Sequence, residues 1–378
     1  MTNNPAKLFI LAGESSGDAI GADLIAGLKA RQQVEIIGVG GEKMQAEGLA
    51  SLFPIHDLAV MGYRDVLLRL PLLLWRARQT VNAILASQPD IVVLIDAQVF
   101  SQVVASRLRK RSFEKPIVLY VAPSVWAWKP ERARKIAPLY DEVLAVLPFE
   151  PSAMEQLGGP RTSYVGHPAL ARIPMREKLP ANGPLLLLPG SRTGEITKHL
   201  PLMRAVGEMA LAHARVDELV ILSTRAQHAR IEAAVAKWPV PARIVSEANA
   251  RQTVLNEAVA AFAVSGTVTL ELALAGIPHA ITYIAEGAQV RMFQKAITRF
   301  VGLPNILAGA EIVPEILFAH RAEPERAIHA VKDLLDNQAQ RQSQLEAFKT
   351  IRATMEKGAP EAPLSNPVDR IGAWINAR

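Results

Sequence analysis

The sequence has 378 residues, half of them hydrophobic and 21% charged, and its formal net charge at pH 7 is +6. A chain of this length exceeds one ordinary hydrophobic core, so we expect two globular domains. Cysteine is absent, which excludes disulfide frameworks and thiolate metal sites. The 42 basic residues are interspersed with 36 acidic ones, and no zinc knuckle, basic arm or aromatic-basic RNA motif occurs, so we predict no nucleic-acid partner.

The N-terminus and the most apolar segment predict a protein that is neither exported nor inserted in a membrane. Residues 1–6 lack the basic start, the long apolar region and the cleavage site of a secretory signal. The apolar run from Val66 to Trp75 is interrupted by Arg69 and followed by Arg76, far short of the roughly 20 residues that a membrane span requires. We therefore expect a cytoplasmic protein without a transmembrane helix.

Short apolar runs rich in Val, Ile and Leu alternate with helical patterns along the chain. Continuous apolar strands separated by amphipathic helices are typical of parallel sheets with both faces covered. We therefore predict an α/β protein with two Rossmann-like domains and parallel sheets. The predicted strands span residues 8–11, 36–39, 91–95, 117–121, 143–147, 185–188, 219–222, 260–264 and 281–284.

Proline, asparagine and glycine interrupt the apolar rhythm between Pro168 and Pro184, which predicts the domain boundary there. We expect an N-terminal domain over residues 1–175 and a C-terminal domain over residues 176–357. From Pro324 onward the pattern is wholly helical. Breaker residues then precede a last helix within residues 358–378, which we expect to pack back at the domain junction.

The segments after the predicted strands are the candidate site, because ligands of open α/β sheets bind beyond the carboxyl ends of the strands. The first strand leads into a segment with two glycines and a helix start, which could hold a polar ligand. An ordinary strand-to-helix turn capped by Ser or Asp explains the segment equally well. Its polar residues are Glu14, Ser15, Ser16 and Asp18.

The strand at residues 91–95 delivers Asp96 to its carboxyl end. A carboxylate there is costly unless it is hydrogen-bonded or reactive, so Asp96 is our candidate general base. The alternative is a helix N-cap for residues 100–111, and from position alone the two have even odds.

Two tryptophans, Trp126 and Trp128, lie two residues apart after the strand at residues 117–121. Tryptophan is commonly buried for packing, but two in one loop beside Lys129 and Arg132 suit an amphiphilic acceptor with a sugar and a phosphate.

Two loops in the second half favour phosphate binding. Glycine allows close approach of the backbone, a helix N-terminus binds anions, and Arg192 could neutralise the charge on a departing nucleotide. Glu271 could accept hydrogen bonds from ribose hydroxyls, although a Glu near a helix start is often only a capping or dipole partner. The first loop contains Gly190, Ser191 and Arg192. The second contains Ser265, Gly266 and Thr267 and precedes the helix with Glu271.

Three further segments carry weaker signals. Asn305 is a candidate nucleotide or hinge contact. Residues 62–85, helical in pattern apart from a break at Pro71, mix apolar side chains with arginines, as do residues 291–300. That mixture suits interfacial membrane contact, but core-facing helices with snorkelling arginines are the commoner explanation.

Several short motifs, in this order along nearly the whole chain, resemble the lipid-A-disaccharide synthase family. The paired tryptophans and the segment around Pro304 and Asn305 are the most specific. The motifs are residues 12–18, Val60-Met61-Gly62, residues 123–128, Leu147-Pro148-Phe149-Glu150, Val165-Gly166-His167, residues 188–192, Ser265-Gly266-Thr267 and residues 303–309.

This resemblance implies a GT-B glycosyltransferase with an N-terminal acceptor domain and a C-terminal UDP-sugar domain. The implied reaction joins UDP-2,3-diacylglucosamine and 2,3-diacylglucosamine 1-phosphate into a β-1,6-linked tetraacyl disaccharide 1-phosphate and UDP, with inversion and with no cofactor or required metal. Asp96 matches the family's catalytic centre, and Arg192, Glu271 and Asn305 fall on the nucleotide side. The family usually has a proline and an acid where this sequence has Gln98 and Val99.

The expected acceptor side or domain cleft comprises Glu14, Ser15, Ser16, Asp18, Met61, Trp126, Trp128 and His167. We expect peripheral association with the anionic inner face of the cytoplasmic membrane, while a homo-oligomer is an option that the sequence leaves open. Two rivals remain at this point: a UDP-sugar epimerase of the same fold that uses His167, and a non-catalytic paralogue that only binds UDP-sugars or lipid.

Overall fold

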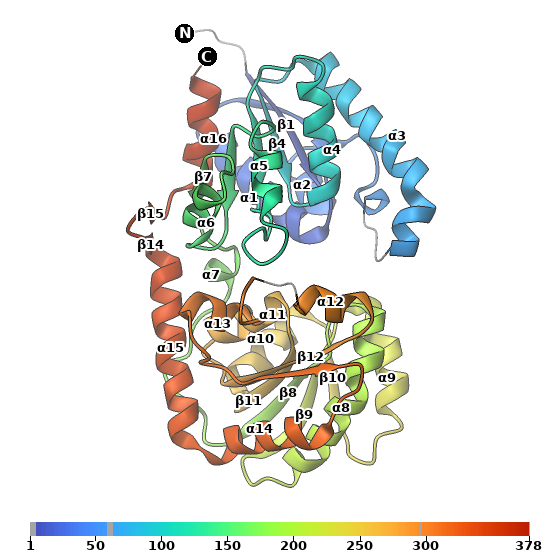
Figure 1. The fold of residues 1–378 in the computed structure, drawn as a ribbon, viewed down its shortest axis with the longest axis vertical. Helices are drawn as coiled ribbons and strands as arrows, with labels where there is room; N and C mark the ends of the chain where they lie inside the picture. Colours follow the sequence, from blue (N-terminus) through green and yellow to red (C-terminus); the bar gives the residue numbers. More distant parts are fainter. Residues whose placement is uncertain (1–4, 59–62, 295–296, 378) are drawn as a thin grey trace. The chain divides into compact units, whose positions relative to one another are not determined.

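The computed structural model describes residues 5–58, 63–294 and 297–377 (Figure 1). The chain forms two compact units, one of Met1–Pro168 with Met355–Arg378 and the other of Ala169–Thr354. The first boundary therefore falls at Pro168, and the last segment of the chain joins the first unit. Each unit is built on a parallel sheet covered by helices, and each is described by itself.

The first unit contains a seven-stranded parallel sheet. The chain moves outward from β1 on one side and returns to add β4 on the other, so the strand order reverses between β1 and β4. Ala12 and Ile95 pair at the carboxyl ends of these two strands. In sheet order the strands are β3 (Ala50–Ser51), β2 (Val34–Val39), β1 (Ala6–Ala12), β4 (Ile91–Ile95), β5 (Ile117–Tyr120), β6 (Glu142–Ala145) and β7 (Thr162–Tyr164).

Helices with apolar faces complete this unit. The sheet and the buried sides of α3, α4, α5 and α6 form one hydrophobic cluster, and α1 packs beside α2 and α16 (Figure 1). The helices are α1 (Ser15–Lys29), α2 (Glu42–Ala46), α3 (Tyr63–Ser87), α4 (Gln98–Arg109), α5 (Glu131–Ile136), α6 (Glu150–Gln156) and α16 (Pro367–Asn376).

Helix α3 continues through Pro71, so the expected break there is wrong. Proline removes one backbone donor and leaves one carbonyl of the preceding turn without its helical partner. Pro71 lies on the exposed side of the helix, where water can satisfy that carbonyl. The helix therefore continues past Pro71 to Ser87.

The second unit contains a six-stranded parallel sheet whose strand order reverses between β8 and β11. Leu188 and Ala263 pair at the carboxyl ends of these strands. In sheet order the strands are β10 (Arg243–Val245), β9 (Val216–Leu222), β8 (Gly183–Leu188), β11 (Ala260–Val264), β12 (His279–Ala285) and β13 (Glu315–Ala319).

Helices α8, α9 and α14 pack their apolar sides on one face of this sheet in a single hydrophobic cluster. The helices of this unit, of which α15 runs on into the first, are α7 (Ala169–Arg172), α8 (Thr193–Leu211), α9 (His228–Val235), α10 (Ala248–Glu257), α11 (Thr267–Leu274), α12 (Ala288–Gln294), α13 (Leu303–Ala308), α14 (Pro324–Asp336) and α15 (Gln338–Lys357).

All nine predicted strands are present, and four further strands, β3, β7, β10 and β13, are the edges of the two sheets. Edge strands are short or only partly buried, so they lack the continuous apolar run that reveals a central strand. The chain after Pro324 is helical as expected, and the predicted interruption before the last helix contains a short hairpin. In this hairpin, the two-residue strands β14 (Gly358–Ala359) and β15 (Ala362–Pro363) pair antiparallel before α16.

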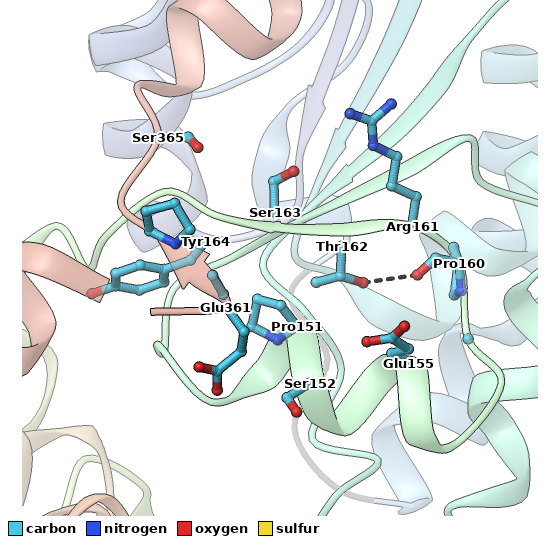
Figure 2. A pocket seen from close by; sticks show the side chains of 13 residues that line it. Pro151, Ser152, Glu155, Pro160, Arg161, Thr162, Ser163, Tyr164, Glu361 and Ser365 are labelled. Carbon is cyan, nitrogen blue, oxygen red and sulfur yellow. Dashed lines mark hydrogen bonds between the residues drawn. The ribbon is translucent and has the colours of Figure 1, made fainter. Parts of the chain in front are cut away.

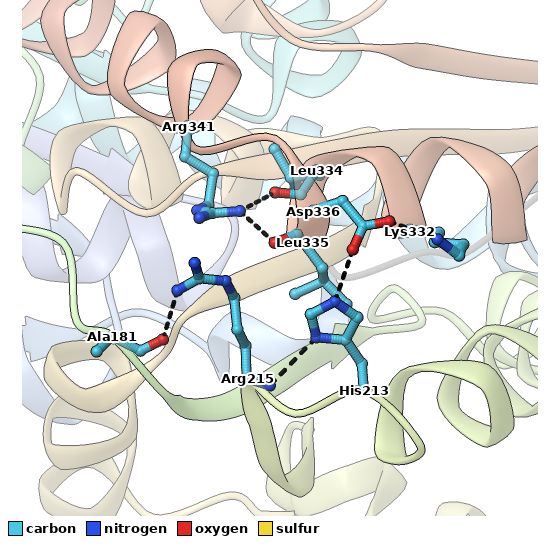
Figure 3. A network of polar contacts seen from close by, with 8 residues as sticks. All are labelled: Ala181, His213, Arg215, Lys332, Leu334, Leu335, Asp336 and Arg341. Carbon is cyan, nitrogen blue, oxygen red and sulfur yellow. Dashed lines mark hydrogen bonds and ion pairs between the residues drawn. The ribbon is translucent and has the colours of Figure 1, made fainter.

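A polar network holds the junction of α14 and α15 in the second unit (Figure 3). The Arg341 guanidinium is buried and donates to the Leu334 and Leu335 carbonyls at the end of α14. The Arg215 backbone N–H donates to His213 Nδ1, so the other ring nitrogen carries the hydrogen that faces Asp336 at 2.9 Å. The two Arg341 bonds satisfy carbonyl groups that the end of α14 leaves without helical partners.

A buried carboxylate fastens the C-terminal helix to the first unit. Glu142 in β6 accepts hydrogen bonds from Ser163 Oγ at 2.6 Å, from Arg370 Nε and Nη2 at 2.8 and 2.6 Å, and from Trp374 Nε1 at 2.6 Å. Gly27 in α1 allows close contact, because a Cβ atom there would lie 2.5 Å from a Val368 methyl group.

We predict that Glu142→Ala lowers the free energy of unfolding of the first unit by about 3 kcal/mol, because it leaves the Arg370 and Trp374 donors of α16 without their acceptor. Urea unfolding followed by circular dichroism measures the change. Asp369→Ala, which removes an exposed ion pair with Arg31, is the matched control and should cost less than about 1 kcal/mol. Equal small losses in the two variants would contradict the role of Glu142.

Candidate functional site

The turns after β1 and β4 lie against each other where the strand order of the first sheet reverses. A Cβ atom on Gly13 would lie 2.4 Å from Ala97 Cβ, so only glycine allows this approach. Glu14, Ser15 and Ser16 follow Gly13 and are exposed at the start of α1. The expected polar segment therefore lies beside the Asp96 turn, at the place in the sheet where ligands of such folds bind.

Asp18 differs from these neighbours because its carboxylate is buried. It accepts hydrogen bonds from the backbone N–H groups of Gly41, Lys43 and Met44 at 2.7, 3.0 and 3.1 Å. These bonds anchor the turn between β2 and α2. Asp18 thus supports the segment, and a direct contact with substrate stays a prediction.

Asp96 follows β4 directly and is only half-buried. Burial raises the pKa of its carboxyl group above the ordinary value of 3.8, and a hydrogen bond with the Ala97 backbone partly opposes that rise. Helix α4 begins at Gln98, and its N-cap residue is Ala97 with no side-chain capping bond. The helix-capping alternative for Asp96 is therefore wrong, and a partly desolvated carboxylate remains at the strand reversal.

Trp126 is held by a residue that the sequence analysis did not single out. Its Nε1–H donates to Glu150 at 3.2 Å, and its ring packs edge-on against Phe149 with the centroids 4.9 Å apart. Burial raises the Glu150 pKa to about 7, although backbone donors at Val146 and Leu147 and the indole favour the ionised form. The sequence signal for Glu150 is its place at the end of the motif Leu147-Pro148-Phe149-Glu150, where α6 begins.

The other expected acceptor-side residues are less fixed by their contacts. Trp128 is half-buried, and Lys129 Nζ lies 5.6 Å from the centre of its ring. His167 is half-buried in the segment between β7 and α7. Met61 lies outside the described residues.

The first predicted phosphate loop follows β8 at the strand reversal of the second sheet. Gly190 has φ of 98°, and a Cβ atom there would lie 2.7 Å from Glu195 Oε2. Glu195 accepts from the Arg192 backbone at 3.3 Å and contacts Arg192 Nη1 at 3.1 Å, which fixes the start of α8. Ser191 and Arg192 are exposed, so both are available to an anion.

The second predicted loop follows β11, the neighbour of β8 across the reversal. Ser265 Oγ donates to the Val301 carbonyl at 2.9 Å. Gly266 and Thr267, at the start of α11, are exposed. A Cβ atom on Gly266 would meet open space, so a ligand can approach this backbone closely. Because β8 and β11 are paired, both loops leave the sheet at the same edge.

Glu271 and Asn305 already have partners. Glu271 forms an ion pair of 2.9 Å with Arg251, and each side chain is about one-third exposed. The Asn305 side chain is buried. It donates to the Val313 carbonyl and to Glu315, and it accepts from the backbone of Ile312 and Val313, all at 2.8–2.9 Å. Asn305 therefore shapes its own loop, and direct nucleotide contact stays a prediction.

His199 connects the first phosphate loop to β12. Its Nδ1 lies 2.8 Å from the Glu195 carbonyl, and its Nε2 accepts from the Ile284 backbone at 3.0 Å, so the neutral ring carries its hydrogen on Nδ1. Burial lowers the His199 pKa and favours this neutral form. The sequence offered no signal for this contact beyond a histidine within a helical pattern.

A separate hollow of about 420 Å³ lies between α6, β7 and the hairpin of β14 and β15 (Figure 2). Thr162 Oγ1 donates to the Pro160 carbonyl along its wall at 2.9 Å. Its lining contains none of the predicted site residues. The hollow lies at the β7 edge of the sheet and not at the strand reversal, so it is not the candidate site.

Comparison with known proteins decides the family. The model of the lipid-A-disaccharide synthetase family matches residues 8–364. This chain belongs to the lipid-A-disaccharide synthetase family. The lipid-A-disaccharide synthase of Nitrobacter hamburgensis is 40% identical over 367 residues, covering 94% of this chain and 92% of that protein. The family resemblance seen in the motifs is confirmed.

Solved structures show the same fold at low sequence identity. MnaA of S. aureus in complex with UDP has a TM-score of 0.62 at 12% identity, covering 95% of this chain and 99% of that one. The calicheamicin glycosyltransferase CalG4 has a TM-score of 0.58 at 15% identity, covering 99% of both chains. The GT-B fold is confirmed, and family membership makes the chain a glycosyltransferase and supports neither rival function.

Proposed function

We propose that the chain joins two acylated sugars in a single displacement. The donor is UDP-2,3-diacylglucosamine and the acceptor is 2,3-diacylglucosamine 1-phosphate. The acceptor's 6-hydroxyl oxygen bonds to C1 of the donor sugar, the bond from C1 to the phosphate oxygen breaks, and UDP departs with the electron pair. A β-1,6-linked tetraacyl disaccharide 1-phosphate results, with inversion at C1.

Asp96 is the proposed base that removes the proton of the acceptor's 6-hydroxyl group. The observation that carries this role is the position of its carboxylate at the strand reversal, next to the exposed polar start of α1. The raised pKa adds support, because a more basic carboxylate takes a hydroxyl proton more effectively. On the acceptor side we assign Glu14, Ser15 and Ser16 to sugar or phosphate contacts.

The tryptophan loop is the proposed contact for the rest of the acceptor. Trp126 presents a large ring whose orientation is fixed by Glu150 and Phe149. A fixed aromatic surface can pack against a sugar face or an acyl chain at little entropic cost. Trp128, Met61 and His167 complete the proposed acceptor side.

The two loops at the reversal of the second sheet form the proposed donor site. Gly190 and Gly266 would let the backbone approach the pyrophosphate, and the starts of α8 and α11 would present N–H groups to it. Arg192, whose side chain is 69% exposed, would offset the charge that develops on the departing UDP. Ser191, Ser265, Thr267, Glu271 and Asn305 belong to the same proposed site.

We predict that Asp96→Asn lowers kcat by at least about a hundredfold, because amide nitrogen cannot accept the proton. UDP affinity should not change, since the donor loops belong to the other unit. In the unaltered protein, kcat should rise with pH through the raised Asp96 pKa, because only the deprotonated carboxylate is a base.

Mass spectrometry of the product from defined donor and acceptor measures this turnover. Release of UDP only when the acceptor is present would exclude a free epimerase reaction, and formation of the disaccharide would exclude a protein that only binds. An active Asn variant would show that Asp96 is not the base.

We predict that Gly266→Ala weakens UDP binding about tenfold or more, because the added methyl group would separate the backbone from the pyrophosphate. Stability should change by less than about 1 kcal/mol, since the residue has extended backbone geometry and open surroundings. Isothermal titration calorimetry with UDP gives the affinity. Gly372→Ala, which also adds a methyl group in open space, is the control and should bind UDP normally.

A groove between α3 and α4 is the proposed membrane contact. No described helix is long and apolar enough to cross a membrane. The groove has a volume of about 590 Å³, and its lining combines three apolar side chains with four cationic ones. Apolar groups facing the acyl boundary and cations facing phosphates are the pattern of interfacial binding. The groove is lined by Leu74, Trp75, Arg78, Val81, Arg107, Lys110 and Arg111.

The exposed apolar side chains of α3 extend this surface. Leu68 and Trp75 are 78% and 55% exposed, which is unusual for large apolar side chains. Peripheral attachment at the cytoplasmic face would place the enzyme where lipid substrates reside. The second stretch considered, residues 291–300, exposes Met292 and Ile297, but part of it lies outside the described residues.

We predict that Lys110→Gln with Arg111→Gln weakens binding to vesicles containing anionic phospholipid by about 2 kcal/mol, or about thirtyfold, because each cation contributes about 1 kcal/mol near such a surface. Vesicle sedimentation measures the binding, and added salt should reduce it. Arg230→Gln with Lys237→Gln removes two exposed cations of the second unit and should have no effect. Equal binding by both double variants would reject the groove.

A further inference from the structure

Three non-glycine residues with left-handed backbone geometry meet at the ends of β4 and β5. Asp96 has φ of 53°, Ala97 has φ of 45° and Val121 has φ of 80°. Because Ile95 pairs with Tyr120, the two strands end side by side and these residues follow together. A β-branched residue such as valine is rarely found in this region, and such strain persists only where the surroundings enforce it.

Gln98 supplies the contact that joins the two strained turns. Its side-chain Nε2 donates to the Val121 carbonyl at 3.1 Å. One step earlier, the Asp96 backbone N–H donates to the Tyr120 carbonyl at 2.9 Å. The glutamine amide therefore continues the pairing of the two segments after β4 has ended and the backbone no longer can.

Each of the two turns also forms a hydrogen bond with another part of the first unit. The Val121 backbone N–H donates to the Leu144 carbonyl at 2.9 Å, and Ser101 Oγ donates to the Asp96 carbonyl at 2.8 Å. Among the described residues, Gln98 provides the side-chain hydrogen bond that joins the Asp96 turn to the Val121 turn. Without it, Val121 could relax to negative φ and turn its carbonyl away from α4.

A proline at position 98 would be incompatible with this arrangement. Proline has no side-chain donor for the Val121 carbonyl, and it restricts the preceding residue to extended backbone. Ala97 here has φ of 45° and ψ of 47°, which a following proline would disfavour. The glutamine and the left-handed turn therefore depend on each other in the segment that carries Asp96.

We propose that Gln98 is a positioning residue for catalysis: its amide locks the Asp96 turn to the end of β5 and so sets the direction of the Asp96 carboxylate. This inference rests on the proposed role of Asp96 as the general base. Gln98 itself need not touch the substrate. Its loss should reduce turnover, because small displacements of a catalytic group are costly, and should not alter donor binding.

The test compares Gln98→Met with Gln102→Met in the full chain. Methionine keeps the length of glutamine but cannot donate a hydrogen bond. Gln102 lies one turn further along the same helix and is half-buried, so it controls for the substitution itself. We expect Gln98→Met to lower kcat at least tenfold, with unchanged UDP affinity, and Gln102→Met to stay within twofold of the unaltered protein.

Two further measurements separate positioning from a general loss of structure. The acid limb of the kcat–pH profile should move to lower pH in Gln98→Met, because a released carboxylate becomes more hydrated. The circular dichroism spectrum and the urea unfolding transition of Gln98→Met should stay close to those of the unaltered protein, because only one side-chain hydrogen bond is lost.

The outcomes distinguish the two proposals. Normal kcat and a normal pH profile in Gln98→Met, with Asp96→Asn inactive, would overturn the positioning role alone. An acid limb that does not move in a folded Gln98→Met variant of low activity would also count against it. An active Asp96→Asn variant would overturn the general-base role and this inference together.

Discussion

Parallel pairing of the strands is the constraint on which the candidate site depends. In a parallel sheet every strand ends at the same edge, and a reversal of strand order sends the two neighbouring connections to opposite faces. That happens once in each unit, between β1 and β4 and between β8 and β11. The turns at these reversals are the ones that carry Asp96 and the two glycine-containing phosphate loops.

Buried carboxylates make up much of the framework around these turns. Asp18 and Glu142 each accept several N–H donors from segments that are distant in sequence. Glu150 accepts one from Trp126 and two from the turn just before it. An ionised carboxylate in the interior is costly without such donors, so each of these groups fixes the segments that supply them. Asp18 sets the turn beside α1, Glu142 holds α16, and Glu150 orients Trp126.

Asp96 is treated differently by the fold. Its side chain is only half-buried and its pKa is raised, whereas the backbone around it is strained and held by neighbouring contacts. A general base needs a fixed direction and a carboxylate that can still accept a proton from the substrate. The contacts of Gly13, Ser101 and Gln98 fix the backbone around Asp96, and none of them occupies its carboxylate oxygens.

The sequence by itself determined the central strands, the two parallel sheets and the loops that carry Asp96, Arg192 and Gly266. These follow from local properties, since a strand covered on both faces must be a continuous apolar run and the loops after it are read off directly. Its ordered motifs also sufficed to indicate the family.

Only the tertiary structure decided the edge strands, the course of α3 through Pro71 and the partners of the polar residues. Edge strands lack full burial, and a partner such as Glu150 for Trp126 or Val121 for Gln98 comes from a segment more than twenty residues away. The Asp18 carboxylate likewise accepts from a turn more than twenty residues away, and the Asn305 side chain is bonded within its own loop. Which polar side chain remains free to meet a ligand depends on such contacts, and no local pattern encodes them.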